Sequence, residues 1–355
     1  MTKFARSSCC LMLALLLCLS FCSVGYATEV NSSLTPSQTS QLLSIVSDLE
    51  PQKSMLGLSN VDFNNLYLGE PIQTYIYTND TFVKSHDLFP VLYNNTIVFW
   101  AYDNNGNIQI SAGLSSKINS CGIGEKPFAI IYDANKAYAF SDNQFVLLAT
   151  SNYTNTSRSV LNPHARSITP NLEMQSLSAK EKIQYIGKRS TAHRLNVNFV
   201  SQDLTYLGIP SSYICWAATA ACIVNYCKGT SKTAVDVAKD YHGPADFNYS
   251  IVLSEMDDVL GQYSLTYTAK EQVPSERVVL ENIDDGYPIA SGWTYASGSK
   301  HFCTIYGTNP ISGYHYVMDP DQGFLTAILG SSGYTYVSAV SGDTLTFYSA
   351  ACHSW

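Results

Sequence analysis

The spacing of apolar residues predicts one helix and then a sheet in the first part of the chain. Leu42, Ile45 and Leu49 recur at helical spacing, and Thr35 precedes them as a residue that caps helix N-termini. β-rich runs with turn residues between them follow this helix. The pattern is typical of a small α+β domain made mostly of antiparallel sheet. The runs are Thr74–Tyr77, Val91–Tyr93, Thr96–Tyr102, Ile108–Ser111, Ala129–Tyr132, Ala137–Phe140 and Phe145–Leu148.

The last part of the chain shows helical patterns first and strand patterns afterwards. An alanine-rich helix is predicted from Ile214 to Lys228, with Gly229 as its C-terminal glycine. A helical part followed by an antiparallel sheet is therefore expected in residues 195–355. Further helical patterns cover Thr233–Tyr241, Ile251–Gln262 and Ser275–Asp284. Strand patterns cover Ile289–Trp293, His301–Gly307, Tyr314–Asp319, Tyr334–Val340 and Thr344–Ala350.

Residues 1–27 have the features of a secretory signal peptide. A short basic start precedes an apolar run from Cys10 to Val24, and Gly25 and Ala27 are small residues where a signal peptidase cuts. The run of about 15 residues is shorter than the ~20 that a transmembrane helix needs. We therefore expect a secreted protein, extracellular or periplasmic, with no membrane segment after removal of the signal. A retained anchor, or a lipoprotein acylated at Cys22, is the alternative.

Composition and charge divide the mature chain and limit its function. Charged residues make up only 14% of the chain, which disfavours intrinsic disorder and a coiled coil. The net charge of −8 leaves no basic excess for binding nucleic acid. Residues 28–150 and 195–355 are acidic, whereas residues 151–194 contain seven basic and two acidic residues and are rich in Ser, Thr, Asn and Pro. We predict two domains joined by an exposed basic linker that proteases can cut.

Cys215 is the candidate nucleophile because of its place in the predicted helix. It falls on the first helical turn, where unpaired backbone N–H groups and the positive end of the helix dipole favour a thiolate. Residues 195–355 contain five cysteines, so at least one stays unpaired in an exported protein. Cys222 lies about 10 Å from Cys215 along the helix, beyond the ~7 Å that a disulfide spans. A structural role as a small apolar residue is the alternative.

The strands that follow supply a candidate general base and a candidate orienting acid. His301 begins a β-like run after a flexible segment and is the first candidate base, with His315 on a tyrosine-flanked strand as the reserve. Asp319 ends a neighbouring strand and is the candidate that orients the imidazole. Its rivals are Asn309 and Asp321, each in a predicted turn. The sequence thus predicts a Cys–His–Asp arrangement that joins a helix terminus to two strands.

A glutamine and the three candidate catalytic residues occur in a characteristic order along the chain. Gln202 precedes the Cys-Trp-Ala-Ala sequence that begins at Cys215, and His301 and Asp319 follow. This pattern resembles the papain-like cysteine peptidases. It is most similar to the compact bacterial branch that includes the staphopains and secreted plant-pathogen effector peptidases. The separations of 86 residues from Cys215 to His301 and 18 from His301 to Asp319 suit that branch, and the resemblance covers residues 195–355.

The resemblance implies roles, a fold and a reaction. Cys215 is implied as nucleophile, His301 as general base and acid, Asp319 as orienting residue and Gln202 as a donor to the oxyanion. The implied fold is papain-like α+β, a helical lobe plus an antiparallel β lobe, preceded by the smaller domain of residues 28–150 as a propeptide and intramolecular inhibitor. The implied reaction is peptide-bond hydrolysis in a protein or peptide substrate by a secreted zymogen, with no metal or organic cofactor.

Three other functions are compatible with the same residues. The same Cys–His–Asp residues also serve acyl transfer or deamidation, as in a transglutaminase-like toxin. Only the products show whether water or an amine accepts the acyl group from the thioester. A processing peptidase for double-glycine leaders is the second, although such enzymes usually accompany a transporter. A secreted binding or adhesion module with a non-catalytic Cys215 is the third. The sequence contains no HExxH, GxSxG or phosphate-binding glycine loop that would support a different chemistry.

Overall fold

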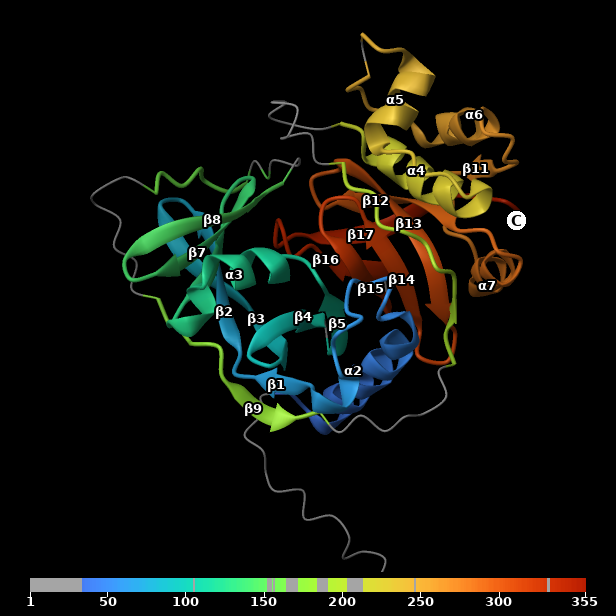
Figure 1. Cartoon of the computed structure of the whole chain (residues 1–355). Helices are drawn as coiled ribbons and strands as arrows, with labels where there is room; N and C mark the ends of the chain where they lie inside the picture. Colours follow the sequence, from blue (N-terminus) through green and yellow to red (C-terminus); the bar gives the residue numbers. More distant parts are fainter. Residues whose placement is uncertain are drawn as a thin grey trace, which may run out of the picture. The chain divides into compact units, whose positions relative to one another are not determined.

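The fold is described from a computed structural model (Figure 1). It describes residues 34–104, 106–151, 155, 157–163, 172–183, 191–202, 213–245, 247–330 and 333–355. These residues belong to one compact unit, Leu34–Trp355. The predicted signal peptide lies outside the described residues. Within these ranges, no helix combines the length and the apolar character that crossing a membrane requires.

The N-terminal part contains a capped helix and the strands β1–β8. The helix α2 (Pro36–Leu49) begins after Thr35, whose side chain accepts a hydrogen bond from the Gln38 backbone, while the Gln38 side chain accepts one from the Thr35 backbone. Every β run predicted for this part lies within one of the strands β2–β8, so these local predictions are confirmed. The elements are α2, β1 (Tyr67–Gly69), β2 (Ile72–Thr78), β3 (Thr81–Tyr93), β4 (Thr96–Asn104), β5 (Asn107–Ser111), α3 (Ser115–Cys121), β6 (Ala129–Tyr132), β7 (Lys136–Ser141) and β8 (Gln144–Thr150).

Six antiparallel strands close into a barrel in the described C-terminal part. Each strand pairs with the next, and the last pairs back with the first, so the ring has no open edge. Inside it, Trp293 stacks on Phe347 with 4.9 Å between ring centroids and meets Tyr336 edge-on at 4.8 Å. The strands are β12 (Ile289–Tyr295), β13 (Lys300–Asn309), β14 (Tyr314–Asp319), β15 (Gly323–Gly330), β16 (Gly333–Val337) and β17 (Thr344–Cys352).

Short helices and strands surround this barrel. Small side chains let one of the helices, α4 (Cys215–Lys228), approach β13 closely, and the Thr304 hydroxyl of β13 donates to the Thr219 carbonyl of α4 at 3.5 Å. Figure 1 shows α4, α5 and α6 grouped together beside the barrel strands. The other elements are α5 (Ala234–His242), α6 (Met256–Gly261), α7 (Glu276–Asp284), β9 (Ala179–Lys182) beside β1, β10 (His193–Arg194) beside β13 and β11 (Thr268–Lys270) beside β17.

The predicted fold class is wrong. A papain-like α+β fold with a helical lobe, a β lobe and a smaller preceding α+β domain was expected, whereas the structure is mostly β around a closed barrel and has few helices. The strand β15, over which no strand was predicted from the sequence, completes the ring. The helices α4–α6 do not enclose a core of their own, because their hydrophobic cluster also contains Phe302 of β13 and Ala351 of β17.

Backbone pairing and buried polar contacts join the N-terminal strands to the barrel. The strand β5 pairs with β15 at Ser111 and Leu325. At the end of α2, the buried Asp48 carboxylate accepts hydrogen bonds from the Tyr316 hydroxyl at 2.6 Å and the Asn309 amide at 2.7 Å. A buried carboxylate destabilises a protein unless donors satisfy it, so these two bonds fix α2 to the barrel.

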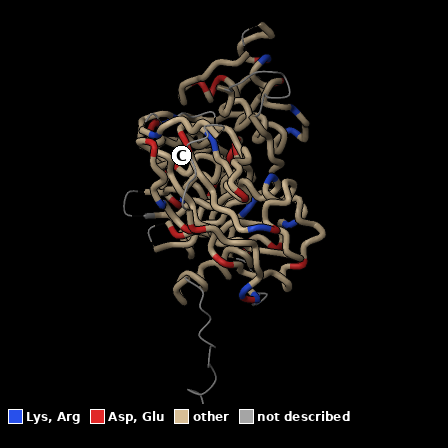
Figure 2. Tube along the Cα trace, turned by 90° about the vertical axis from the view of Figure 1, so that its left-hand side faces the viewer, with Lys and Arg blue, Asp and Glu red and all other residues tan. Residues whose placement is uncertain are grey.

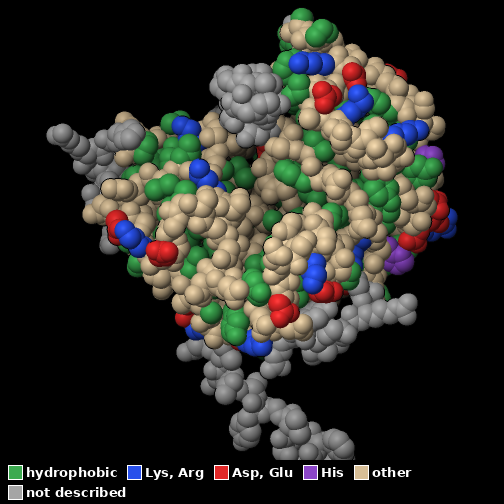
Figure 3. Space-filling view, viewed as in Figure 1, with side chains coloured by type: hydrophobic (Ala, Val, Ile, Leu, Met, Phe, Trp, Pro, Cys, Tyr) green, Lys and Arg blue, Asp and Glu red, His purple; other side chains and the backbone are tan. Residues whose placement is uncertain are grey.

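Charged side chains are sparse on this unit. Figure 2 shows lysine, arginine, aspartate and glutamate residues spread along the trace among many uncharged positions. On the face seen in Figure 3, the basic side chains lie among polar and hydrophobic groups and form no continuous basic patch. This face therefore offers mainly uncharged polar and apolar groups to a partner.

Candidate active site

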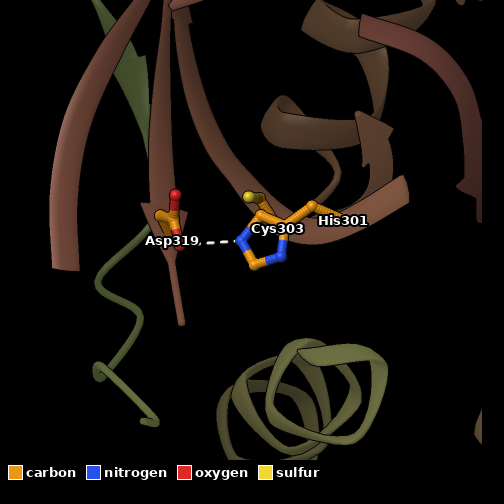
Figure 4. A group of neighbouring side chains, drawn as sticks. All are labelled: His301, Cys303 and Asp319. Carbon is orange, nitrogen blue, oxygen red and sulfur yellow. Dashed lines mark hydrogen bonds and ion pairs between the residues drawn. The ribbon is translucent and has the colours of Figure 1, made fainter. Parts of the chain in front are cut away.

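His301 and Asp319 form a buried hydrogen-bonded pair on neighbouring strands of the barrel. The imidazole Nε2 of His301 lies 2.8 Å from Oδ1 of Asp319, and their side chains are only 6% and 2% exposed. Figure 4 shows the carboxylate directed at one ring nitrogen, with the sulfur of Cys303 beside the ring. Because Nε2 is engaged by the carboxylate, Nδ1 is the ring nitrogen left to exchange a proton with a reacting group.

Three further donors fix the Asp319 carboxylate. The backbone N–H of Asp321 donates to Oδ1 at 2.8 Å, while the Gln322 amide and the Tyr336 hydroxyl donate to Oδ2 at 2.7 and 2.8 Å. A carboxylate offers about four acceptor positions. With His301 as the fourth donor, the group is fully satisfied and its orientation is fixed.

The pair carries opposite charges. Burial alone would lower the pKa of His301, but the Asp319 carboxylate outweighs it and holds that pKa well above the ordinary value. Burial alone would raise the pKa of Asp319, but the charge and hydrogen bond of His301, together with the other donors, hold it below the ordinary value. An imidazolium in this position can stabilise a nearby thiolate and can donate a proton from Nδ1.

Cys215 is the first residue of α4, one residue after the predicted start at Ile214, and lies on the first helical turn as predicted. Its side chain is half-buried, and its place puts the sulfur at the positive end of the helix dipole. In the described part of the chain, no hydrogen bond joins the Cys215 thiol to the His301 ring. The packing of α4 on β13 connects the elements that carry the two residues. Thr219, one turn after Cys215, is bonded by Thr304, which stands three residues after His301.

The other thiols of the C-terminal part are in surroundings that keep them neutral. Burial raises the pKa of Cys222, Cys303 and Cys352 to about 12 and also raises that of Cys227. All six cysteines in the described ranges are free thiols. Among them Cys215 alone lies at a helix N-terminus, which makes it the cysteine best placed to act as a nucleophile.

Gln202 lies beside the turn that follows Asp319. Its backbone N–H donates to the Pro320 carbonyl at 3.3 Å, and its side-chain amide donates to the Asp321 carboxylate. Gln202 is 2% exposed, and within the described residues its side-chain oxygen has no hydrogen-bond partner. The structure thus brings Gln202 to the side of the His301–Asp319 pair, with one amide N–H already engaged by Asp321.

The comparison with known families bears on this part of the chain. A family model described as papain-like cysteine protease AvrRpt2 matches residues 191–329, less than half of the chain. This segment is therefore similar to papain-like cysteine proteases. Cys215, His301, Asp319 and Gln202 all lie within it, and the match confirms the resemblance stated from the sequence. No curated protein matches the chain.

The rival residues make other contacts within the matched segment. The reserve base His315 is fully buried, stacks on Tyr334 with 3.7 Å between ring centroids, and bonds Thr308 through Nδ1 at 3.1 Å. Asn309 bonds Asp48 of α2, and the Asp321 carboxylate bonds Gln202. The structure therefore pairs Asp319, and neither rival, with His301.

Gln322 and Tyr336 are the two side chains at the site that the sequence analysis missed. Both donate to Asp319, Gln322 from the turn after β14 and Tyr336 from β16, which β15 separates from β14. A signal for Gln322 existed, because it stands three residues after Asp319 in a turn that also contains a proline. Tyr336 lies 17 residues from Asp319 and gave no local signal.

His301, Cys303 and Asp319 also have the composition of a metal site. One ligand atom of each lies within 4.8 Å of the others, and all three residues are buried. However, the oxygens of Asp319 already accept four hydrogen bonds, and the raised pKa of Cys303 disfavours the thiolate that metals bind. The group is arranged for hydrogen bonding and proton transfer rather than for holding an ion.

Replacing His315 by phenylalanine is expected to make the fold less sensitive to acid. Burial lowers the pKa of His315 to about 3 from 6.5, so the unfolded chain takes up a proton that the folded chain excludes as the pH falls through this window. The free energy of unfolding should therefore fall by up to about 1.4 kcal/mol per pH unit from this residue. Urea unfolding of both proteins near neutral pH and near pH ~4.5 measures the difference. The same pH dependence in both would contradict a neutral buried histidine.

Proposed function

We propose that the protein is a secreted cysteine endopeptidase that hydrolyses peptide bonds through a thioester on Cys215. The observation that carries the proposal is the buried His301–Asp319 pair, in which Nε2 is bound to the carboxylate and Nδ1 remains for the reaction. The helix that begins at Cys215 packs on the strand that carries His301. The family match supports peptidase chemistry for the same segment.

The chemistry follows from an imidazolium beside a thiolate. The thiolate of Cys215 adds to the carbonyl carbon of the scissile bond, and the carbonyl oxygen takes the negative charge. Collapse of this adduct expels the amine, which takes the proton from Nδ1 of His301 and leaves a thioester. Water then gives a proton to Nδ1 and adds to the thioester carbon. The second collapse releases the acid product and restores thiolate and imidazolium.

The oxyanion requires donors that point at the developing charge. The backbone N–H of Cys215 lies in the first helical turn, where no intrahelical acceptor is available to it. Gln202 is the proposed second donor, through the amide N–H that Asp321 does not engage. Two such donors would stabilise both tetrahedral adducts.

Export and activation by cleavage are part of the proposal. The basic residues and the Ser, Thr, Asn and Pro content of 151–194 support a cleavable segment, and the signal-like residues 1–27 support secretion. The domain of residues 28–150 would inhibit the enzyme until this segment is cut. Arg158 and Asn155, at the start of the segment, bond Asp343 at 2.8 and 2.7 Å, so the end nearest the N-terminal part is fixed to the barrel.

The test is an analysis of products and labelled sites on the full chain. The purified protein is incubated with casein and a thiol reductant, with and without excess methylamine, and the products are identified by mass. New N-termini in casein, their loss after iodoacetamide labels Cys215, and an active form that begins after residue 150 are expected. Incorporated methylamine or deamidated glutamine without cleavage would assign an acyltransferase or deamidase instead. No modification of casein would favour a binding module.

A further inference from the structure

We infer that Gln322 is a positioning residue for Asp319 and that the N-terminal part of the chain sets its orientation through the β16–β17 loop, residues 338–343. This inference rests on the proposed function, because it concerns the residues that orient His301. It gives the N-terminal part a second role besides inhibition: support of the catalytic acid for as long as this part stays packed on the barrel, also after the segment 151–194 has been cut.

The first step links Asp319 to the β16–β17 loop. The amide nitrogen of Gln322 donates to Oδ2 of Asp319 at 2.7 Å, and its amide oxygen accepts the backbone N–H of Ala339 at 2.8 Å. Gln322 is 8% exposed, so water competes little for either bond. The Ala339 N–H therefore decides which way the amide of Gln322 faces, and the correct orientation presents a donor to the carboxylate.

The second step links the β16–β17 loop to the N-terminal part. The hydroxyl of Tyr132, on β6, donates to the Ala339 carbonyl at 3.1 Å. Arg158 bonds the Asp343 carboxylate at 2.8 Å and also donates to the Ser341 carbonyl, with its side chain only 5% exposed. Both ends of the loop are therefore fixed by side chains from outside the barrel.

Close backbone packing supports the same connection. A Cβ added at Gly342 would lie 2.6 Å from the ring of Tyr132, so this ring sits directly on the loop backbone. A Cβ added at Gly113 would lie 2.9 Å from Cβ of Ala339 and 3.2 Å from the side chain of Gln322. The N-terminal part thus contacts Gln322 and its partner Ala339, and neither glycine position has room for a larger residue.

The strand β16, which precedes the β16–β17 loop, links a second donor of Asp319 to the N-terminal part. Tyr336 donates to Asp319, and the next residue, Val337, donates its N–H to Gln109 of β5 at 3.0 Å and accepts a hydrogen bond from the Tyr102 hydroxyl of β4. Two of the four donors to Asp319 are consequently positioned by backbone that the N-terminal part fixes. Residues 195–355 alone lack the side chains that support these two donors.

The experiment uses the protein made as the full chain, measured after cleavage of the segment 151–194 with the N-terminal part still bound, and compares Gln322→Leu, Tyr132→Phe and Tyr316→Phe with the wild type. Tyr316→Phe is the matched control, because it also removes one tyrosine hydroxyl that bonds across the same boundary, to Asp48, but at a place unconnected to Gln322. The first readout is the far-downfield proton resonance of the His301 Nε2–H, assigned by its loss in His301→Gln. The second is kcat and KM on a casein-derived peptide.

We expect Gln322→Leu to shift or broaden the His301 resonance and to lower kcat about ten- to hundredfold with little change in KM, because the residue touches no substrate. Tyr132→Phe should shift the same resonance in the same direction with a smaller loss of kcat, and Tyr316→Phe should leave both unchanged. If the wild type cleaves no peptide but the resonance responds in this order, the proposed function is wrong and the positioning role stands. An unchanged resonance in Gln322→Leu, or an equal response to Tyr316→Phe and Tyr132→Phe, would overturn the inference.

Discussion

Cys215→Ala should abolish casein hydrolysis, with a loss of about 10⁴-fold or more, while leaving the fold intact. The thiolate forms the covalent intermediate, and an alanine offers no nucleophile to replace it. The half-buried position at the start of α4 tolerates a smaller side chain, and alanine favours helix. Hydrolysis is followed by the release of soluble peptides, and thermal unfolding of both proteins checks the fold.

Cys227→Ala provides the matched control. Cys227 is also a half-buried free thiol on α4, but it lies near the C-terminal end of the helix. Its loss should change the rate by no more than about twofold. The opposite result would contradict the assignment. If Cys215→Ala still hydrolyses casein in the presence of a thiol reductant and Cys227→Ala is inactive, the nucleophile is Cys227 and not Cys215.

Asp319→Asn should lower kcat by about 10²- to 10⁴-fold. The carboxylate accepts four hydrogen bonds, and an amide in its place turns an N–H group toward donors that need an acceptor. Removal of the negative charge also lowers the pKa of His301, so less imidazolium is present near neutral pH. Peptide hydrolysis over a range of pH values measures both effects.

Asp284→Asn is the control for this variant. Asp284 also binds a histidine, His193, at 2.7 Å, but the two side chains are 50% and 43% exposed and lie on α7 and β10. Its replacement should leave kcat unchanged, because a solvent-exposed pair contributes little. A small effect of Asp319→Asn, no larger than that of Asp284→Asn, would show that the carboxylate does not orient the catalytic histidine.

Local features of the chain could be predicted from its sequence. The cap at Thr35, the place of Cys215 on the first turn of α4 and the strand that carries His301 depend on neighbouring residues, and the structure shows each of them. The pairing of His301 with Asp319 was reached through spacing and family resemblance, since the two residues are 18 positions apart.

The architecture could not be predicted, because it depends on contacts between distant residues. The strand β15 follows a turn, and its role is decided by pairing with β14 and β16 to close the barrel. The bond from Tyr316 to Asp48 spans 268 residues, and that from Tyr132 to Ala339 spans 207. No local pattern marks such partners, so the fold class was wrong although most of the individual elements were right.

The most direct test of the central claim is the rate at which iodoacetamide alkylates Cys215 near pH ~6, below the ordinary pKa of a thiol at ~8.5. The wild type and His301→Ala are compared by mass spectrometry of the peptide that contains Cys215, with the peptide of Cys227 as internal reference. If His301 holds Cys215 as a thiolate, the wild type reacts rapidly and His301→Ala reacts at least about tenfold more slowly. Equal rates in the two proteins would contradict the proposed cysteine–histidine pair.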